Sequence, residues 1–171
     1  MGGGAIYSYA EDAKKDYANK IDVITSFDVI EHVTDPLAFL RDIYDLLSPD
    51  GTAIIGTPTR TPVTRALLGE VYEKIVLYTA QHLWIFSEDS LRRLSKQAGF
   101  SEFSVRYFQK WDITNLLAWL QYRKPMSVGS EDWNTKSNVR YDFVTPTLNE
   151  VYKRTLEEHA LADYMAIYLK K

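Results

Sequence analysis

Two short apolar segments with a helix between them limit the fold of this chain more than any other feature of its sequence. Ile21–Phe27 is apolar and β-rich, which is typical of a strand buried on both faces of a parallel sheet. Asp35 and Pro36 predict a helix start, because aspartate caps helices and proline fits the first helical position. A second apolar strand, Thr52–Pro58, follows and stops at its proline. The predicted order is strand, helix, strand.

The helix that begins at Pro36 has one apolar face. Its apolar residues recur at intervals of three and four, as a buried face requires, at Leu37, Leu40, Ile43, Tyr44 and Leu47. Ser48–Gly51 consists of residues that favour turns, so we expect a turn between this helix and the second strand.

The alternation continues along the chain. Ser87 predicts the start of a helix that ends at Gly99, a residue suited to left-handed φ. Phe100–Phe108 and Tyr164–Leu169 have the apolar and aromatic character of two further strands. Helical spacing precedes the last strand, at Leu148, Val151, Tyr152 and Leu156. We therefore predict an α/β fold with right-handed crossovers and a single domain over residues 1–171.

Two segments interrupt the alternation, near residues 59–86 and 110–141. Ligands of open α/β sheets bind beyond the carboxyl ends of the strands, so insertions after Pro58 and Phe108 are natural lids. The alternative is that the tryptophans of the second segment, Trp111, Trp119 and Trp133, only pack the interior.

Composition excludes several classes of chemistry. The 171 residues contain no cysteine, which excludes disulfides, thiolate nucleophiles and cysteine-bound metal clusters. A balance of 20 basic against 23 acidic residues, a net charge of −3, argues against nucleic-acid binding. Because no apolar stretch approaches the ~20 residues of a membrane span, we expect no such span and assign the cytoplasm by default.

A series of motifs, in this order and spacing, resembles the class I S-adenosylmethionine-dependent methyltransferases that act on small molecules. The motifs are Asp22–Pro36, Leu46–Gly51, Thr57-Pro58, His82–Ser87, Leu91, Gln97–Phe100 and Leu161–Tyr164. The resemblance implies a partial Rossmann-like sheet that is mostly parallel, with an antiparallel last strand and helices on both faces.

The resemblance also implies that part of the family's domain lies outside this sequence. The family carries a Gly-x-Gly-x-Gly donor loop between an earlier strand and a helix, and Gly2-Gly3-Gly4 has no strand before it. We therefore expect an incomplete domain, inactive alone, whose strand Ile21–Phe27 has an exposed apolar edge that pairs in a homodimer. The alternative to a methyltransferase is a noncatalytic module for binding or assembly.

By the resemblance, S-adenosylmethionine would be bound by Glu11, Asp12, Phe27 and Asp28. Asp12 is expected to accept a hydrogen bond from the adenine amino group, and Phe27 to flank the methionine part. The alternative for Asp12 is a favourable interaction with the dipole of its own helix.

Asp28, Glu31 and His32 are spaced i, i+3 and i+4, so one helical turn would place them on a single face. A histidine there suits removal of an acceptor proton, with Glu31 beside it. Ubiquinone-pathway O-methyltransferases have a similar acid-x-x-Glu-His pattern that binds a divalent metal. In this chain the first acid is aspartate, whose shorter side chain argues against metal binding, so we predict no metal ligands. Glu31 and His32 can alternatively serve only to order the turn.

The acceptor is expected to be a small molecule that contacts Thr57, His82 and Trp84. For His82, packing beside the tryptophan is the alternative role.

Overall fold

The computed structural model describes residues 6, 9–74, 81–123 and 143–171. It divides the chain into two compact units, which we call unit 1 and unit 2. Unit 1 comprises Met1–Thr57, Phe86–Arg106 and Ala166–Lys171. Unit 2 comprises Pro58–Ile85 and Tyr107–Met165. Gly2-Gly3-Gly4 and Trp133 lie outside the described residues.

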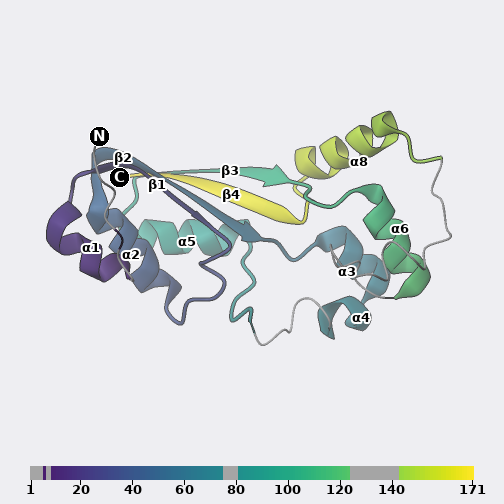
Figure 1. The fold of residues 1–171 in the computed structure, drawn as a ribbon, viewed down its shortest axis with the longest axis horizontal. Coiled ribbons are helices and arrows are strands. Elements are labelled where there is room, and N and C mark those ends of the chain that lie inside the picture. Colours follow the sequence, from purple (N-terminus) through teal and green to yellow (C-terminus); the bar gives the residue numbers. More distant parts are fainter. Residues whose placement is uncertain (1–5, 7–8, 75–80, 124–142) are drawn as a thin grey trace. The chain divides into compact units, whose positions relative to one another are not determined.

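A four-stranded sheet forms the centre of unit 1 (Figure 1). Its strands are β1 (Ile21–Phe27), β2 (Leu47–Pro58), β3 (Glu102–Phe108) and β4 (Tyr164–Lys170), in the order β1-β2-β4-β3. β1 and β2 are parallel. The end of β4 lies at the starts of its neighbours, because Ser101 N donates to Lys170 O and Lys171 N donates to Gly51 O. β4 is therefore antiparallel to both, which confirms the predicted mostly parallel sheet with a reversed last strand.

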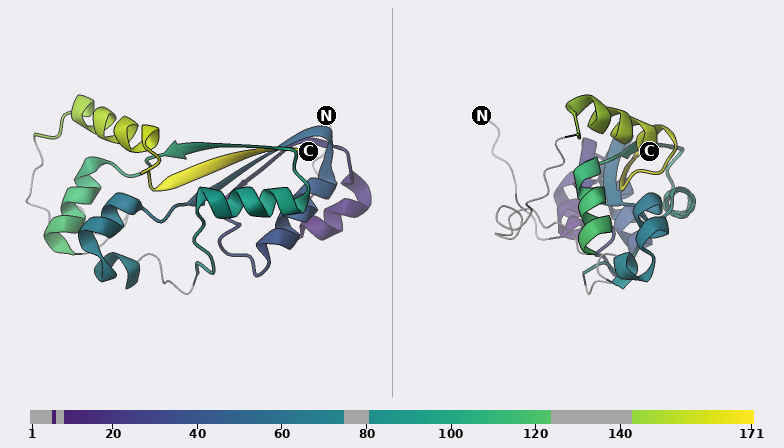
Figure 2. Two further views of the ribbon diagram at one scale, coloured as in Figure 1. Left: turned by 180° about the vertical axis from the view of Figure 1, so that it is seen from behind. Right: turned by 90° about the vertical axis from the view of Figure 1, so that its right-hand side faces the viewer.

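Three helices of unit 1 lie on the same face of the sheet (Figures 1 and 2). They are α1 (Ala10–Tyr17), α2 (Pro36–Leu46) and α5 (Glu88–Ala98), and α2 contacts both of the others. Both predicted helix starts are confirmed, because the Asp35 side chain accepts from Ala38 N and the Ser87 side chain accepts from Ser90 N.

The predicted turn over Ser48–Gly51 is wrong, because these residues belong to β2. Ile21 pairs with Leu47 and Val23 with Thr52, so the pairing advances two residues along β1 but five along β2. The turn-favouring residues thus form an irregularity inside the strand. Leu47, expected on the helix face, is instead the buried first residue of β2.

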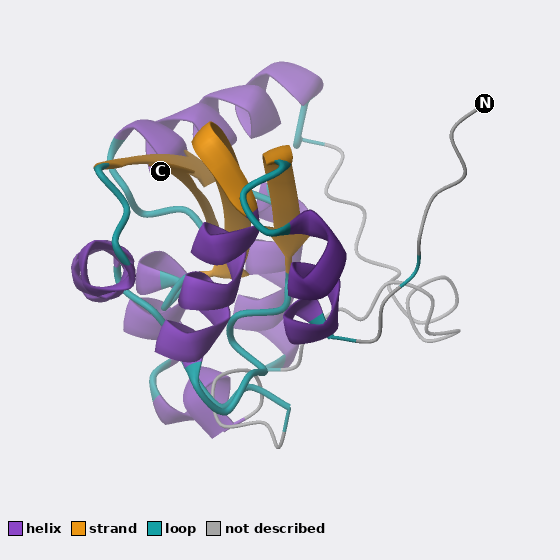
Figure 3. Ribbon diagram, turned by 90° about the vertical axis from the view of Figure 1, so that its left-hand side faces the viewer, coloured by secondary structure: helices purple, strands orange, loops and turns teal. Residues whose placement is uncertain are grey.

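Figure 3 shows the strands of the sheet in orange, and β1 is one of the two edge strands in the described strand order. Its apolar side chains are not all covered, since Val23 is 59% exposed and Phe27 is 52% exposed. A β1 with one neighbour and two exposed apolar residues differs from the expected strand buried on both faces.

Unit 2 is built from α3 (Pro62–Leu68), α4 (Glu70–Tyr72), α6 (Ile113–Tyr122) and α8 (Pro146–Glu158). Leu68, Tyr72 and Trp119 form a buried apolar cluster, with the Tyr72 and Trp119 ring centroids 5.5 Å apart. Trp119 is therefore a packing residue of this unit. Within the described ranges, no helix has the length and apolar composition needed to span a bilayer.

Candidate functional site

The first group of predicted site residues lies at the carboxyl ends of β1 and β2. Because the two strands are parallel, these ends share one edge of the sheet, and Phe27 pairs with Gly56 there. The amide of Asp28 donates to the Gly56 carbonyl at 3.0 Å, which extends the pairing past the end of β1. Phe27 presents its ring to solvent at this position.

The segment after β1 forms a turn and no helix. Asp28 has a left-handed φ of 55°, and His32 N donates to Val29 O at 2.9 Å to close the turn. The helical turn expected to align Asp28, Glu31 and His32 is therefore wrong, because left-handed φ is incompatible with it. Among the described residues, Asp28 does not join Glu31 and His32 in a group close enough to hold a metal ion.

Glu31 is a buried carboxylate with a side-chain donor from the neighbouring strand. Its side chain lies in the interior at 2% exposure, and the Thr57 hydroxyl donates to Glu31 Oε2 at 3.0 Å. In the part of the chain that the structure describes, Glu31 Oε1 accepts no hydrogen bond. A buried carboxylate held on one side only is unusual, since buried polar atoms are normally paired.

His32 lies next to this carboxylate and reaches the surface. Its Nε2 is 3.9 Å from Glu31 Oε1, and its side chain is 38% exposed. An imidazole that reaches the surface beside a buried carboxylate is placed where it can contact a proton-donating group of a bound molecule.

Glu11 and Asp12 lie in the first turn of α1. The Asp12 side chain is 51% exposed, and its carboxylate is 3.6 Å from the Lys15 ammonium. The position is consistent both with binding a ligand amine and with the alternative of a favourable helix-dipole interaction.

His82 and Trp84 lie in unit 2, before α5. His82 is half-buried and Trp84 is largely exposed. Neither of them lines the pocket that unit 2 contains. Thr57 belongs to unit 1 and is fully buried. Its hydroxyl donates a hydrogen bond to Glu31.

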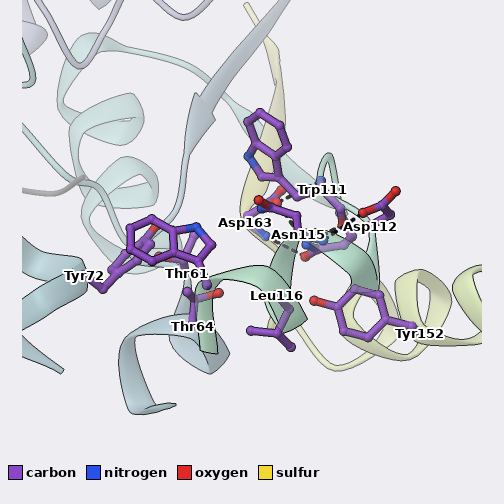
Figure 4. Close-up of a pocket in the computed structure, with 11 residues that line it drawn as sticks. Thr61, Thr64, Tyr72, Trp111, Asp112, Asn115, Leu116, Tyr152 and Asp163 are labelled. Atoms are coloured by element: carbon purple, nitrogen blue, oxygen red, sulfur yellow. Dashed lines mark hydrogen bonds between the residues drawn. The ribbon is translucent and has the colours of Figure 1, made fainter. Parts of the chain in front are cut away.

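Unit 2 contains a pocket of about 120 Å³ (Figure 4). Its lining combines aromatic rings with polar groups from α3, α4, α6, α8 and the segments before α3, α6 and β4. Six of the lining residues are Thr61, Tyr72, Trp111, Asn115, Tyr152 and Asp163.

Asp163 organises the polar side of this pocket. Its carboxylate accepts from Lys110 N at 2.8 Å, from Trp111 N at 3.1 Å and from Gln109 Nε2 at 2.9 Å. Gln109 Oε1 in turn accepts from the Asp163 amide at 3.1 Å. Burial raises the pKa of Asp163 above its ordinary value, while these backbone donors and the charges of Lys110 and Lys153 oppose the rise.

Two tyrosines of the pocket have displaced pKa values. Burial raises the pKa of Tyr72 to about 12, and the Thr61 hydroxyl opposes the rise without making a well-formed hydrogen bond. Burial also raises the pKa of Tyr152 to about 12, assisted by the charges of Asp163 and Asp112. Both phenols are therefore neutral at physiological pH.

Residues 7–104 match the family model described as "Methyltransferase domain". That match covers more than half of the sequence. The chain belongs to this methyltransferase family.

Relatives of this methyltransferase domain are longer than the chain. A ubiquinone biosynthesis O-methyltransferase from Ruegeria pomeroyi is 32% identical over 112 residues, which are 63% of this chain and 44% of that protein. One of the same name from Dinoroseobacter shibae is 36% identical over 84 residues, which are 47% of this chain and 34% of that protein. The chain thus spans less than half the length of these curated relatives.

Solved structures agree on the fold of this methyltransferase domain. A SAM-dependent methyltransferase from Archaeoglobus fulgidus aligns with a TM-score of 0.53 at 18% identity, over 97% of this chain and 66% of that one. A SAM-dependent methyltransferase from Thermotoga maritima gives the same TM-score and identity over 90% of this chain and 57% of that one. The Rossmann-like methyltransferase fold expected from the sequence is confirmed.

Sequence reasoning on this methyltransferase domain missed the pocket of unit 2. Asp163 and Gln109 are 54 residues apart, and no local pattern links them. The motif Leu161–Tyr164 and the aromatic content of residues 110–141 were the available signals, but neither identifies a pocket.

Proposed function

We propose that this chain is part of an S-adenosylmethionine-dependent methyltransferase that acts on a small-molecule acceptor. The observation that carries the proposal is the buried Glu31 beside the surface-reaching His32, at the strand ends of a chain matched by the methyltransferase family model. Proton acceptance at such a position is what methylation of a hydroxyl requires.

The donor site in this proposal consists of Glu11, Asp12, Phe27 and Asp28. When bound, S-adenosylmethionine supplies an electrophilic methyl group on a sulfonium. The exposed Phe27 ring suits contact with its apolar part, and the exposed Asp12 carboxylate suits a hydrogen bond from an amine. Both side chains are accessible, so the residues present are compatible with the donor.

His32 is the proposed proton acceptor, and Glu31 stabilises the imidazolium that forms. Thr57 acts as a positioning residue, because its hydroxyl holds Glu31 Oε2 and leaves Oε1 toward His32. In this proposal Thr57 supports the site through Glu31 and does not touch the acceptor, while His82 and Trp84 remain candidate acceptor contacts. The name of the relatives, ubiquinone biosynthesis O-methyltransferase, supports an oxygen acceptor.

Calorimetric titration of the full chain with S-adenosylhomocysteine tests the donor site. We expect saturable binding that Asp12→Asn weakens by about tenfold, the effect of losing roughly 1.4 kcal/mol. Asp16→Asn is the matched control, since it removes an acidic residue from the same helix outside the proposed site. Absence of any binding would favour the alternative function, a noncatalytic binding or assembly module.

Methyl transfer to catechol by a longer protein that contains this chain tests the role of His32. His32→Gln is expected to lower turnover by about 10²-fold or more, in the range of lost general base catalysis. His159→Gln is the control: it makes the same substitution at an exposed histidine at the end of α8, outside the proposed site, and should leave turnover unchanged. If the His32→Gln variant still bound the methyl donor and retained full turnover, the assignment of His32 as the base would be wrong.

We further propose that a second copy of the chain pairs with the free edge of β1. The exposed Val23 and Phe27 support this proposal, because an uncovered apolar edge strand readily pairs with another strand.

A further inference from the structure

The pocket of unit 2 contains buried polar atoms that have no hydrogen-bond partner among the described residues. Thr61 is 9% exposed, and its Oγ1 makes no hydrogen bond among the described residues. Asn115 Oδ1 is also buried and accepts no hydrogen bond in that part of the chain. Because unpaired buried polar atoms cost free energy, two of them in one pocket indicate that a ligand supplies the missing partners.

The charged groups that line the pocket are both acidic. Asp112 and Asp163 are carboxylates, and no lysine or arginine is among the lining residues that the structure describes. Lys110 and Lys153 act on Asp163 from outside the lining. Thr114 Oγ1 and Asn115 N both donate hydrogen bonds to Asp112 Oδ1. Neither of these two bonds involves the other carboxylate oxygen, Oδ2, and neither donor is charged. The lining therefore favours a ligand that donates hydrogen bonds and carries positive charge.

Aromatic rings supply the rest of the lining. Trp111, Trp119, Tyr72 and Tyr152 all border the pocket. Figure 4 shows the Tyr152 hydroxyl directed from α8 toward Leu116 of α6. Aromatic faces attract cations, and the neutral phenols accept hydrogen bonds from an ammonium group.

The size of the pocket limits the ligand. Its volume of about 120 Å³ is close to the ~150 Å³ of an engineered cavity that binds benzene. The pocket therefore accommodates a group of about one six-membered ring, with an attached substituent at the opening.

We propose that this pocket binds a small organic ammonium ion, a primary amine on a compact apolar body. Thr61 and Asn115 accept hydrogen bonds from the ammonium group, while Asp112 and Asp163 supply the compensating charge. The aromatic side chains contact the apolar body. This inference does not depend on methyl transfer, because it concerns only residues of unit 2.

Titration of the ¹⁵N-labelled chain with benzylamine, followed by NMR on the tryptophan indole signals, tests the proposal. The expected dissociation constant is roughly millimolar, given the ligand's size. Benzyl alcohol is the matched neutral probe, with the same ring and a hydroxyl in place of the ammonium. We expect benzylamine to bind at least about tenfold more tightly, the value of one charge-assisted hydrogen bond.

Two variants test the residues independently. Thr61→Val keeps the β-branched shape and removes the hydroxyl, and Asn115→Leu removes the amide. Each is expected to weaken benzylamine binding by about tenfold, since each removes one of the two acceptors proposed for the ammonium group. Gln121→Leu on the same helix, outside the pocket, should leave binding unchanged.

Three outcomes would overturn the proposal. They are no saturable shift with benzylamine, equal affinity for benzylamine and benzyl alcohol, and binding that both pocket variants leave intact.

Discussion

Gly99 and Ala160 occupy the same position in two helix ends of this chain. After α5, Gly99 N donates to Lys96 O and Phe100 N to Ser95 O. After α8, Ala160 N donates to Glu157 O and Leu161 N to Leu156 O. Both ends are Schellman motifs, which require a left-handed residue, and φ is 112° at Gly99 and 56° at Ala160.

Ala160→Gly should therefore stabilise the protein by about 0.5 kcal/mol, because the left-handed cost of alanine exceeds the added entropy of glycine. Gly99→Ala should destabilise it by more than about 1 kcal/mol, since the new Cβ would lie 3.2 Å from the Tyr44 ring. Urea unfolding measures both. Ala66→Gly, in an exposed position of α3, is the control and should cost about 1 kcal/mol. If Ala160→Gly and Ala66→Gly changed the free energy of unfolding in the same direction, the left-handed position assigned to Ala160 would be contradicted.

The buried hydroxyl of Tyr72 links stability to alkaline pH. Its pKa of about 12 is above the ordinary value of 10.0, so the folded state favours the neutral phenol. The contribution of the neutral Tyr72 phenol to the free energy of unfolding is complete below pH 10 and is lost as the pH rises through about 12. Between about pH 8 and about pH 11 the wild type should lose roughly 1 kcal/mol more stability than Tyr72→Phe. Urea unfolding at the two pH values measures the difference, and equal losses in the two proteins would contradict the pKa assignment.

At the scale of elements, helix α2 depends on its first residues. Asp35 caps it by accepting from Ala38 N at 2.9 Å, and Pro36 begins it. Asp35→Ala should cost about 1 kcal/mol, because the cap bond is lost. That loss corresponds to a decrease in Tm of roughly 2–4 °C for a protein of this length. Asp35→Asn retains the cap and should cost little, so a similar decrease for both variants would show that the cap is not the cause.

The elements were predicted well because their signals are local. The limits of β1 and the caps at Asp35 and Ser87 follow from neighbouring residues. The turn over Ser48–Gly51 was predicted wrongly, because the same residues also fit an irregularity beside β1. Whether these residues make a turn or an irregular part of the strand depends on the pairing of β2 with β1, in which Ile21 is paired with Leu47. Local propensity contains no information on that contact.

At the scale of the whole molecule, the two edges of the described sheet differ in chemistry. β1 exposes Val23 and Phe27 together with one charged residue, Asp22, whereas β3 exposes the charged Glu102 and Arg106 together with Phe108. Charged edges resist pairing with another chain, and apolar edges permit it. The free edge of β1 is therefore the expected site of self-association.

Val23→Lys should convert a dimer of the wild-type chain into a monomer, because it places a charge in the paired edge. Sedimentation velocity at micromolar concentration measures the change. Ser104→Lys introduces the same charge on β3, at the other edge, and should leave the dimer intact. A monomeric wild-type chain, or a dimer that survives Val23→Lys, would rule out pairing through β1.

The sequence by itself determined the strands, the capped helices and the membership of a methyltransferase family. These follow from short-range patterns and motif order. It also supplied the Glu31 and His32 pair, which are adjacent in the chain.

Only the tertiary structure decided how these residues are held. Glu31 meets Thr57 across 26 residues, and Asp163 meets Gln109 across 54. The pocket of unit 2 exists because such distant segments pack together. Burial and hydrogen-bond partners are properties of that packing, so no local pattern determines them.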